Sequence, residues 1–286
     1  MLNAEMKEAI ARALHEDAPY GDITSENLIP PDAHTVAQLH AREAGVMSGV
    51  EVIVEVFSQI DTEISVQVNI ADGQAFNAGE LLATISGNAQ GVLRGERIAL
   101  NFVQRMCGIA TLTSQYVAAV AGTKAKILDT RKTTPGLRLF ERAAVIAGGG
   151  HNHRFSLSDA VLIKDNHLAA LAREGKNLTS ELLELQKKVG PDIKIEVEVD
   201  RLDQLPAVLA GNVDIIMLDN FTLEDLCKGV NLINGQAVVE ASGGVTLSTI
   251  SEIAHTGVDV ISVGALTHSV RALDLGFDME IQVKEA

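Results

Sequence analysis

The chain has 286 residues, 47% of them hydrophobic, and a formal net charge of −15. Its length suits one large α/β domain with a smaller companion, and its apolar fraction allows a substantial core. The acidic balance argues against a general binder of nucleic acids or anionic membranes, which needs a basic face, but it leaves room for a locally basic pocket that takes a small anion.

The sequence shows no pattern of export or of a membrane span. Cys107 and Cys227 are too few for a disulfide framework, so we interpret both as reduced thiols of a cytoplasmic protein. Residues 1–17 lack the apolar centre of a signal peptide. No run of about 18 apolar residues occurs, so we expect no transmembrane helix.

The N-terminal part of the chain predicts helices around antiparallel strands. Residues 2–15 have apolar residues at helical spacing, and a loop rich in Pro, Gly and Asp follows them. Residues 64–88 alternate apolar and polar residues between glycines, which is typical of antiparallel strands. Residues 93–121 predict a long helix that leads into a second domain.

The rest of the chain alternates short apolar runs with helical segments. Such nearly continuous apolar runs indicate a parallel sheet with both faces covered. Most of them end in a polar residue or glycine, which places ligand chemistry at the carboxyl ends of the strands in a barrel or in an open sheet. A GxGxxG motif is missing after the first run, so we favour the barrel. The runs are residues 125–130, 160–166, 193–200, 213–220, 237–244 and 259–266.

Cationic residues gather around the first two of these runs. Arg131 and Lys132 directly follow the first run and suit a site that receives an anion, although a solvated basic loop is an equally good interpretation of this segment alone. His153 and Arg154 precede the second run, and Lys164 in that run can point into the barrel. A metal site made by the nearby histidines is less favoured, since no Cys or carboxylate stands at a zinc spacing.

Carboxylates stand near the ends of the next two runs. Glu198 and Asp219 stand at strand ends, and the two-residue period places Glu196 on the same face as Glu198. Acids inside a barrel suggest Mg²⁺ binding, contacts to sugar hydroxyls, or stabilisation of positive charge on a sugar ring. They could equally be counter-ions of Lys164.

Small residues end the last two runs. Ser242, Gly243 and Gly244 end one of them, and Gly264 stands near the end of the other. Such residues expose backbone N–H groups, which makes a phosphate cradle at the position where barrels bind phosphate. The glycines at 148–150 permit a close backbone approach or a positive φ, and they are only a weak signal of a phosphate loop.

An ordered series of motifs resembles the quinolinate phosphoribosyltransferase family over nearly the whole chain. The series is EDAPYGDIT, GERIALNFVQRMCGIAT, LDTRKTTPGLR, GGGHNHRFSLSDAVLIKDNH, IEVEVD, IIMLDN, VEASGGV and ISVGALTHS. The resemblance implies an N-terminal α/β sandwich with a linking helix at residues 1–113 and an incomplete, roughly seven-stranded α/β barrel at 114–286, whose last residues pack back on the N-terminal domain. It also implies a homodimer with shared active sites. The implied reaction joins quinolinate to phosphoribosyl pyrophosphate with Mg²⁺ and gives nicotinate mononucleotide, pyrophosphate and CO₂ in NAD biosynthesis.

The resemblance also implies roles for individual residues. Lys132, Lys164, Glu198 and Asp219 would be catalytic, and Mg²⁺ would be held through pyrophosphate near the two acids. Ser156 stands where the family pattern has Gly. The residues implied for quinolinate are Arg97 of the partner subunit, Arg131, Lys132, His153, Arg154 and Lys164. The residues implied for the phosphoribosyl donor are Lys132, Glu198, Asp219, Ser242, Gly243, Gly244, Gly264 and His268.

Three other functions stay open at this point. One is a paralogous phosphoribosyltransferase that takes another acceptor, of the type encoded with molybdenum-transport genes. A second is a Schiff-base aldolase that uses Lys164, and a third is an anion-binding protein without activity. The surplus of cations favours a diacid acceptor over the first, and two glycine-rich phosphate sites disfavour the second.

Overall fold

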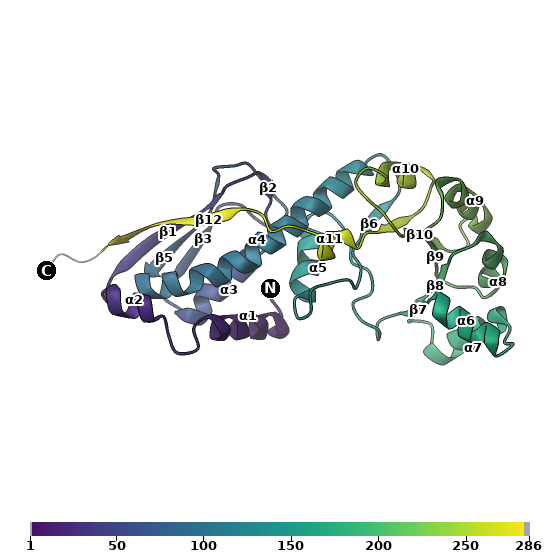
Figure 1. Ribbon diagram of the computed structural model, residues 1–286, viewed down its shortest axis with the longest axis horizontal. Coiled ribbons are helices and arrows are strands. Elements are labelled where there is room, and N and C mark those ends of the chain that lie inside the picture. Colours follow the sequence, from purple (N-terminus) through teal and green to yellow (C-terminus); the bar gives the residue numbers. More distant parts are fainter. Residues whose placement is uncertain (1, 283–286) are drawn as a thin grey trace. The chain divides into compact units, whose positions relative to one another are not determined.

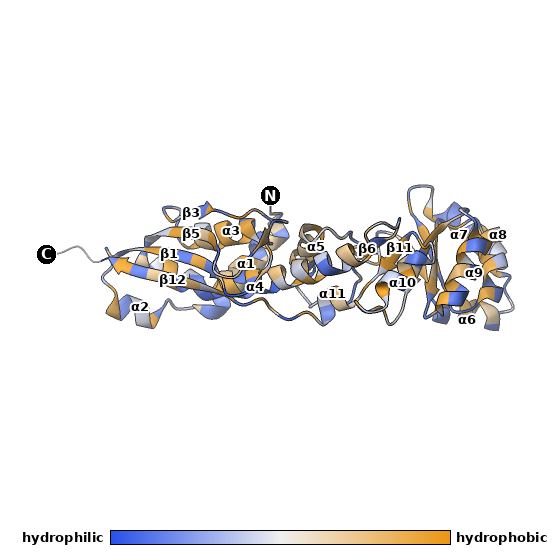
Figure 2. Cartoon of the chain, turned by 90° about the horizontal axis from the view of Figure 1, so that it is seen from above, coloured by the Kyte–Doolittle hydropathy of each residue, from blue (hydrophilic) through white to orange (hydrophobic). Residues whose placement is uncertain are grey.

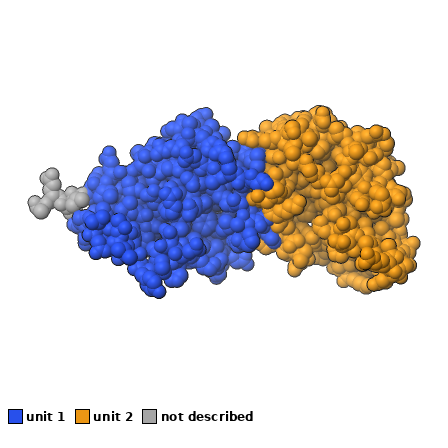
Figure 3. All heavy atoms as spheres, viewed as in Figure 1, with its two compact units in different colours: residues 1–114, 133–149, 269–286 blue, residues 115–132, 150–268 orange. Residues whose placement is uncertain are grey.

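The computed structural model describes residues 2–282, and the chain forms two compact units (Figure 1, Figure 3). The first contains the chain up to Ser114, then Thr133–Gly149, and the chain from Ser269 on. The second contains Gln115–Lys132 and Gly150–His268. Two short segments of the later sequence therefore belong to the first unit.

The first unit is built on a four-stranded antiparallel sheet with the order β12-β1-β5-β3. A separate pair, β2 and β4, is also antiparallel. The strand bounds are β1 His34–Ala41, β2 Gly45–Val46, β3 Ser65–Val68, β4 Ala75–Phe76, β5 Leu81–Asn88 and β12 Leu275–Gln282. The sequence prediction of antiparallel strands in 64–88 is confirmed by β3 and β5.

Every second side chain along β1 is buried on one face. Ala37, Leu39 and Ala41 are buried, whereas most of the intervening residues are exposed, and the alternation can be followed in Figure 2. Phe57 of α3 packs edge-on against Phe277 of β12, with ring centroids 6.4 Å apart. The helices of this unit are α1 Ala4–Asp17, α2 Ile23–Leu28, α3 Val50–Ile60, the first part of α4 Ala89–Ala119, and α5 Arg138–Ala147.

The second unit is built on a parallel sheet of six strands with the order β6-β11-β10-β9-β8-β7. Each of the six apolar runs in the sequence forms one of these strands. Their bounds are β6 Lys126–Leu128, β7 Val161–Ile163, β8 Ile195–Val199, β9 Ile215–Asp219, β10 Val238–Ser242 and β11 Val260–Ser262. The helices are α6 Asp165–Arg173, α7 Leu178–Val189, η1 Leu202–Gln204, α8 Leu205–Ala210, α9 Leu223–Ile233, α10 Ile250–His255 and α11 Ala265–His268.

The barrel is incomplete, and it has six strands where about seven were expected. Beyond β6, the backbone N–H of His151 donates to the carbonyl of Ile127, and the carbonyl of His151 accepts the N–H of Asp129. These two bonds make one isolated bridge. The next ladder bond does not form, because the N–H of His153 goes to the carboxylate of Asp129 at 2.7 Å. A side chain thus replaces the backbone partner, and the seventh strand stops after one bridge.

The predicted long helix exists as α4, which has 31 residues and begins four residues before the expected segment. Within residues 2–282, no helix combines the length and the apolar character needed to cross a membrane.

Candidate active site

A cavity of about 560 Å³ lies within the second unit, where the parallel strands of its sheet end. It collects residues that directly follow several different strands. Its lining consists of Thr130, Arg131, Lys132, His153, Arg154, Leu162, Lys164, Glu198, Met217, Asp219, Asn220, Ser242, Gly243, Gly244 and Ser262.

One side of the cavity is cationic. Lys164, directly after β7, has its Nζ 2.7 Å from Oε2 of Glu198 at the end of β8. Arg154 donates from its Nη1 to the carbonyl of Ala160 at 2.8 Å. Burial, and then the charge of the Arg131 guanidinium, lower the pKa of Arg154. Because both line the same cavity, this side is prepared for an anion.

The loop after β6 is held by hydrogen bonds on both sides of Lys132. The N–H of Lys132 goes to the Thr130 hydroxyl at 3.1 Å, and its carbonyl accepts the Thr267 hydroxyl at 2.8 Å. A Cβ placed on Gly264 would lie 3.0 Å from Nε2 of His268 and 3.1 Å from Cδ of Lys132. Gly264 therefore allows the side chains of His268 and Lys132 to approach the last strand closely, although neither Gly264 nor His268 is part of the cavity lining.

The opposite side of the cavity has a glycine turn after β10. Gly243 and Gly244 both have a positive φ, 95° and 59°, and a Cβ on Gly243 would collide with the side chain of Asn220. The N–H of Asn220 donates to the carbonyl of Ser242 at 2.9 Å, and its amide group contacts Asp219 at 2.6 Å. These contacts join the ends of β9 and β10 into one edge, where glycine lets the backbone approach a ligand.

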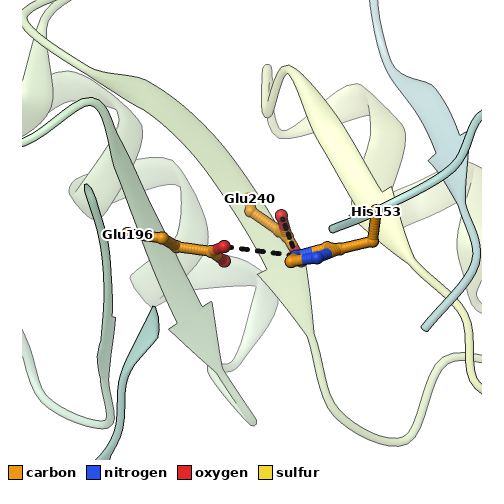
Figure 4. Close-up of side chains that lie close together, drawn as sticks. All are labelled: His153, Glu196 and Glu240. Carbon is orange, nitrogen blue, oxygen red and sulfur yellow. Dashed lines mark ion pairs between the residues drawn. The ribbon is translucent and has the colours of Figure 1, made fainter. Parts of the chain in front are cut away.

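Below the cavity, His153 contacts two buried acids. Its Nε2 lies 3.2 Å from Oε2 of Glu196 and 3.5 Å from Oε2 of Glu240 (Figure 4). Burial lowers the pKa of His153, but the hydrogen bonds and charges of the two carboxylates outweigh it and raise that pKa to about 10. Among the residues 2–282 this trio is the one group of three or more side chains placed to hold a metal ion.

The structure brings ten of the predicted site residues into the cavity lining. Arg97, on α4 in the first unit, is not part of it. The ten are Arg131, Lys132, His153, Arg154, Lys164, Glu198, Asp219, Ser242, Gly243 and Gly244.

Sequence reasoning missed Asn220 and gave no role to Glu240. It placed Glu196 on the inner face but not beside an imidazole. One signal was available for both acids: each stands two residues before a predicted site residue, so the strand period puts it on the same face.

Ser156 belongs to a turn next to the site. The Asp159 carboxylate accepts the N–H of Phe155 at 2.6 Å and the N–H and hydroxyl of Ser156 at 3.2 and 3.0 Å. The Ser156 hydroxyl in turn accepts the N–H of Ser158 at 3.1 Å. This serine therefore ties the loop to Asp159, a bond that glycine could not make through a side chain.

The comparisons with known proteins agree over nearly the whole chain. The model of the N-terminal domain of quinolinate phosphoribosyl transferase matches residues 22–107, and the model of its C-terminal domain matches residues 109–278. The nicotinate-nucleotide pyrophosphorylase (carboxylating) of Mycobacterium leprae is 43% identical over 279 residues, which cover 96% of each chain. The quinolinate phosphoribosyltransferase (decarboxylating) 2b of Nicotiana tabacum is 40% identical over 98% of this chain and 83% of its own.

Solved structures agree as well. NadC from Streptococcus pyogenes superposes with a TM-score of 0.93 at 37% identity and 99% coverage of both chains. The nicotinate-nucleotide pyrophosphorylase from Francisella tularensis superposes with a TM-score of 0.90 at 37% identity and 98% coverage of both chains.

Proposed function

The chain belongs to the quinolinate phosphoribosyltransferase family, and from this premise we propose that its cavity joins quinolinate to the phosphoribosyl group of phosphoribosyl pyrophosphate. The products are nicotinate mononucleotide, pyrophosphate and CO₂. The observation that carries the proposal is the composition of one cavity, with cations on one side, a glycine turn on the other and two carboxylates between them.

The cationic side suits quinolinate, whose two adjacent carboxylates need several positive partners. Arg131, Arg154 and Lys164 would hold them, since guanidinium groups present paired donors and Lys a compact charge. His153 would border the ring beside Arg154. Arg97 of the partner subunit would complete the site in a homodimer, which together with a cytoplasmic location stays a prediction.

The glycine side suits the phosphoribosyl donor. Backbone N–H groups at Ser242, Gly243 and Gly244 would hold its 5′-phosphate, and Gly264 and His268 would extend this cradle. Lys132 would lie between the two substrates. Glu198 and Asp219 would contact the ribose hydroxyls.

Mg²⁺ fits this arrangement as an ion brought by pyrophosphate. It prefers oxygen ligands and binds through one or two carboxylates together with substrate phosphates, and Glu198 and Asp219 supply such carboxylates at the cavity. When bound, it would neutralise charge on the leaving pyrophosphate. The chain's own residues would orient both substrates around it.

The chemistry requires positioning and charge stabilisation and no covalent nucleophile. The bond between ribose C1 and the pyrophosphate oxygen breaks with its electron pair on oxygen, and the ring nitrogen of quinolinate gives its pair to C1. Glu198 and Asp219 would stabilise the positive charge that develops on the ribose. The bond from C2 to the adjacent carboxylate then breaks, CO₂ leaves, and the pair remains on C2 beside the cationic nitrogen until a proton from solvent takes it.

A product assay tests this proposal. With quinolinate, phosphoribosyl pyrophosphate and Mg²⁺, we expect CO₂ and nicotinate mononucleotide to form in equal amounts. Nicotinate in place of quinolinate should give no nucleotide, because it lacks the second carboxylate that the cations would hold. Turnover of nicotinate alone would refute the assignment of the acceptor.

A further inference from the structure

Glu196 and Glu240 are two buried acids beside the cavity that the proposed reaction does not use. They lie on β8 and β10 and are only 3% and 1% exposed. Both strands pair with β9, in which Ile215 is in register with Glu196 and Met217 is in register with Glu240. Each stands two residues before a cavity residue and so lies one layer deeper on the same inner face. Neither is part of the cavity lining.

Both carboxylates point at the imidazole of His153, from strands on either side of β9 (Figure 4). The same residue is also held by its neighbours. Its N–H donates to Asp129 at 2.7 Å, and its Nδ1 accepts the N–H of Arg154 at 2.8 Å. Both ring nitrogens therefore face protein groups, even though the ring borders the cavity.

The burial of the two carboxylates is compensated by their contacts with this ring. Burial and the neighbouring charge of Glu240 raise the pKa of Glu196, while the hydrogen bond with His153 lowers it. One oxygen of each carboxylate has no hydrogen-bond partner among the described residues. Burial of such acids is costly, so their contacts with Nε2 are strongly favoured and leave the ring one orientation.

The two acids and Arg154 favour different protonation states of the ring. The carboxylates favour an imidazolium, whereas the Arg154 N–H needs a lone pair on Nδ1 and favours the neutral ring with its proton on Nε2. In either form Nε2–H points at the acids. The contact at Nε2 is therefore kept in either form, whereas the contact at Nδ1 is made by the neutral ring.

We propose that Glu196 and Glu240 are positioning residues, which fix the imidazole of His153 and, through the contact at Nδ1, the backbone of Arg154, so that the cationic side of the cavity is preorganised for the diacid. This proposal rests on the proposed function for the identity of that diacid. The acids act indirectly, through His153 and Arg154, and do not contact the substrate.

Two substitutions of Glu240 distinguish the effect of its side-chain length from the effect of its charge. Glu240→Asp keeps the charge but withdraws the carboxylate by one carbon–carbon bond, about 1.5 Å, and should raise the KM for quinolinate about 10- to 100-fold, as loss of an orienting partner does elsewhere. Glu240→Gln keeps the length and an acceptor oxygen, and its KM should stay within about threefold of the wild type. For both variants the KM for phosphoribosyl pyrophosphate should stay within about twofold.

A matched control is Asp214→Asn. Asp214 precedes β9 at the opposite end of the sheet, where it contacts Lys194 and the N–H of Ile195 at 2.6 and 2.9 Å. Its substitution should lower the melting temperature and leave both KM values unchanged. Equal changes of both KM values in Glu240→Asp, or no change in either, would overturn the proposal.

The ring of His153 gives a readout that needs no substrate. In ¹⁵N-labelled protein, with His153 assigned by the His153→Asn variant, Glu240→Asp should shift the Nε2 signal and Glu240→Gln should retain it. If the wild type does not turn over quinolinate but the signals behave in this way, the proposed function fails and the positioning role stands. An unchanged Nε2 signal in Glu240→Asp, or one equivalent of bound transition metal lost in both variants, would overturn the positioning role.

Discussion

Lys164 and Glu198 form the closest charged contact at the cavity, and their exposure explains how it can be exchanged. Their side chains are 48% and 13% exposed, so the pair is partly screened by water and contributes little to stability. An incoming carboxylate can therefore compete with Glu198 for the ammonium group. The exchange would leave Glu198 free to face the ribose.

Lys164→Ala should weaken quinolinate binding about 10- to 100-fold, because it removes one charge-assisted hydrogen bond to a carboxylate. Isothermal titration with quinolinate measures this change. Lys187→Ala, which removes an exposed ion pair on α7, is the control and should bind normally. Unchanged affinity in Lys164→Ala would remove this residue from the binding site.

Gly243→Ala should raise the KM for phosphoribosyl pyrophosphate about tenfold or more. A side chain there meets Asn220 and must also adopt a φ of 95°, at a strain of about 1–3 kcal/mol. Gly235→Ala is the matched control, since Gly235 has a φ of 73° and open space around it. It should lose stability without a change in that KM. If Gly243→Ala kept the wild-type KM, the glycine turn would not be the phosphate cradle.

At the scale of elements, two of the three glycines at 148–150 have structural roles. A Cβ on Gly148 would collide with the carbonyl of Ala110 and with Thr113, so this residue allows the end of α5 to lie against α4. Gly149 has a φ of 84° and turns the chain out of the helix. The weak phosphate-loop signal in this segment thus has a structural explanation.

The carboxylate of Glu43 holds the segment that leads into β12. Glu43 forms a bidentate ion pair with Arg271 and accepts the N–H of Asp274 at 2.9 Å. These hydrogen bonds, that with Arg271 first, lower the pKa of Glu43 from 4.5 to about 2. The unfolded chain therefore binds a proton at a higher pH than the folded one. The resulting stabilisation is present above pH 4.5 and is lost as the pH falls through about 2.

Glu43→Gln should consequently lower the midpoint of urea unfolding near neutral pH, and its difference from the wild type should vanish as the pH approaches 2. Urea titrations across this range measure the effect. Arg271→Gln should give the same profile, because it removes the other half of the pair. A difference that persists at the acid end would show that the pair is not its cause.

Prediction from the sequence worked where side-chain pattern decides structure. The β-branched runs predicted all six parallel strands, because a strand buried on both faces needs them. The single bridge beyond β6 could not be predicted, since the ladder ends where the Asp129 carboxylate takes the N–H of His153. The contact of Glu196 and Glu240 with one imidazole was also beyond reach, because it requires the order of strands in the sheet.

At the scale of the whole molecule, each compact unit draws on distant parts of the chain. Arg97 lies in the first unit, and all of the other predicted site residues lie in the second. If two copies share their sites, as we propose, each site takes Arg97 from one subunit and the cavity from the other.

Mixing Arg97→Ala with Lys164→Ala should then restore activity. Random exchange makes half of the dimers mixed, and each mixed dimer has one intact site, so about a quarter of the wild-type rate should return. Mixing Arg131→Ala with Lys164→Ala is the control and should give no more activity than the two variants give separately, since both residues line the same cavity. Absence of rescue in the first mixture would contradict shared sites.

The pairing of β12 with β1, seen side by side in Figure 1, has a consequence for synthesis. Thr35 on β1 donates its hydroxyl to the carbonyl of Glu280, 245 residues later. While a ribosome makes the intervening chain, one edge of β1 has no neighbour and presents open backbone groups to other nascent chains. We therefore expect this edge to be the segment that a molecular chaperone must shield until translation reaches the closing strand.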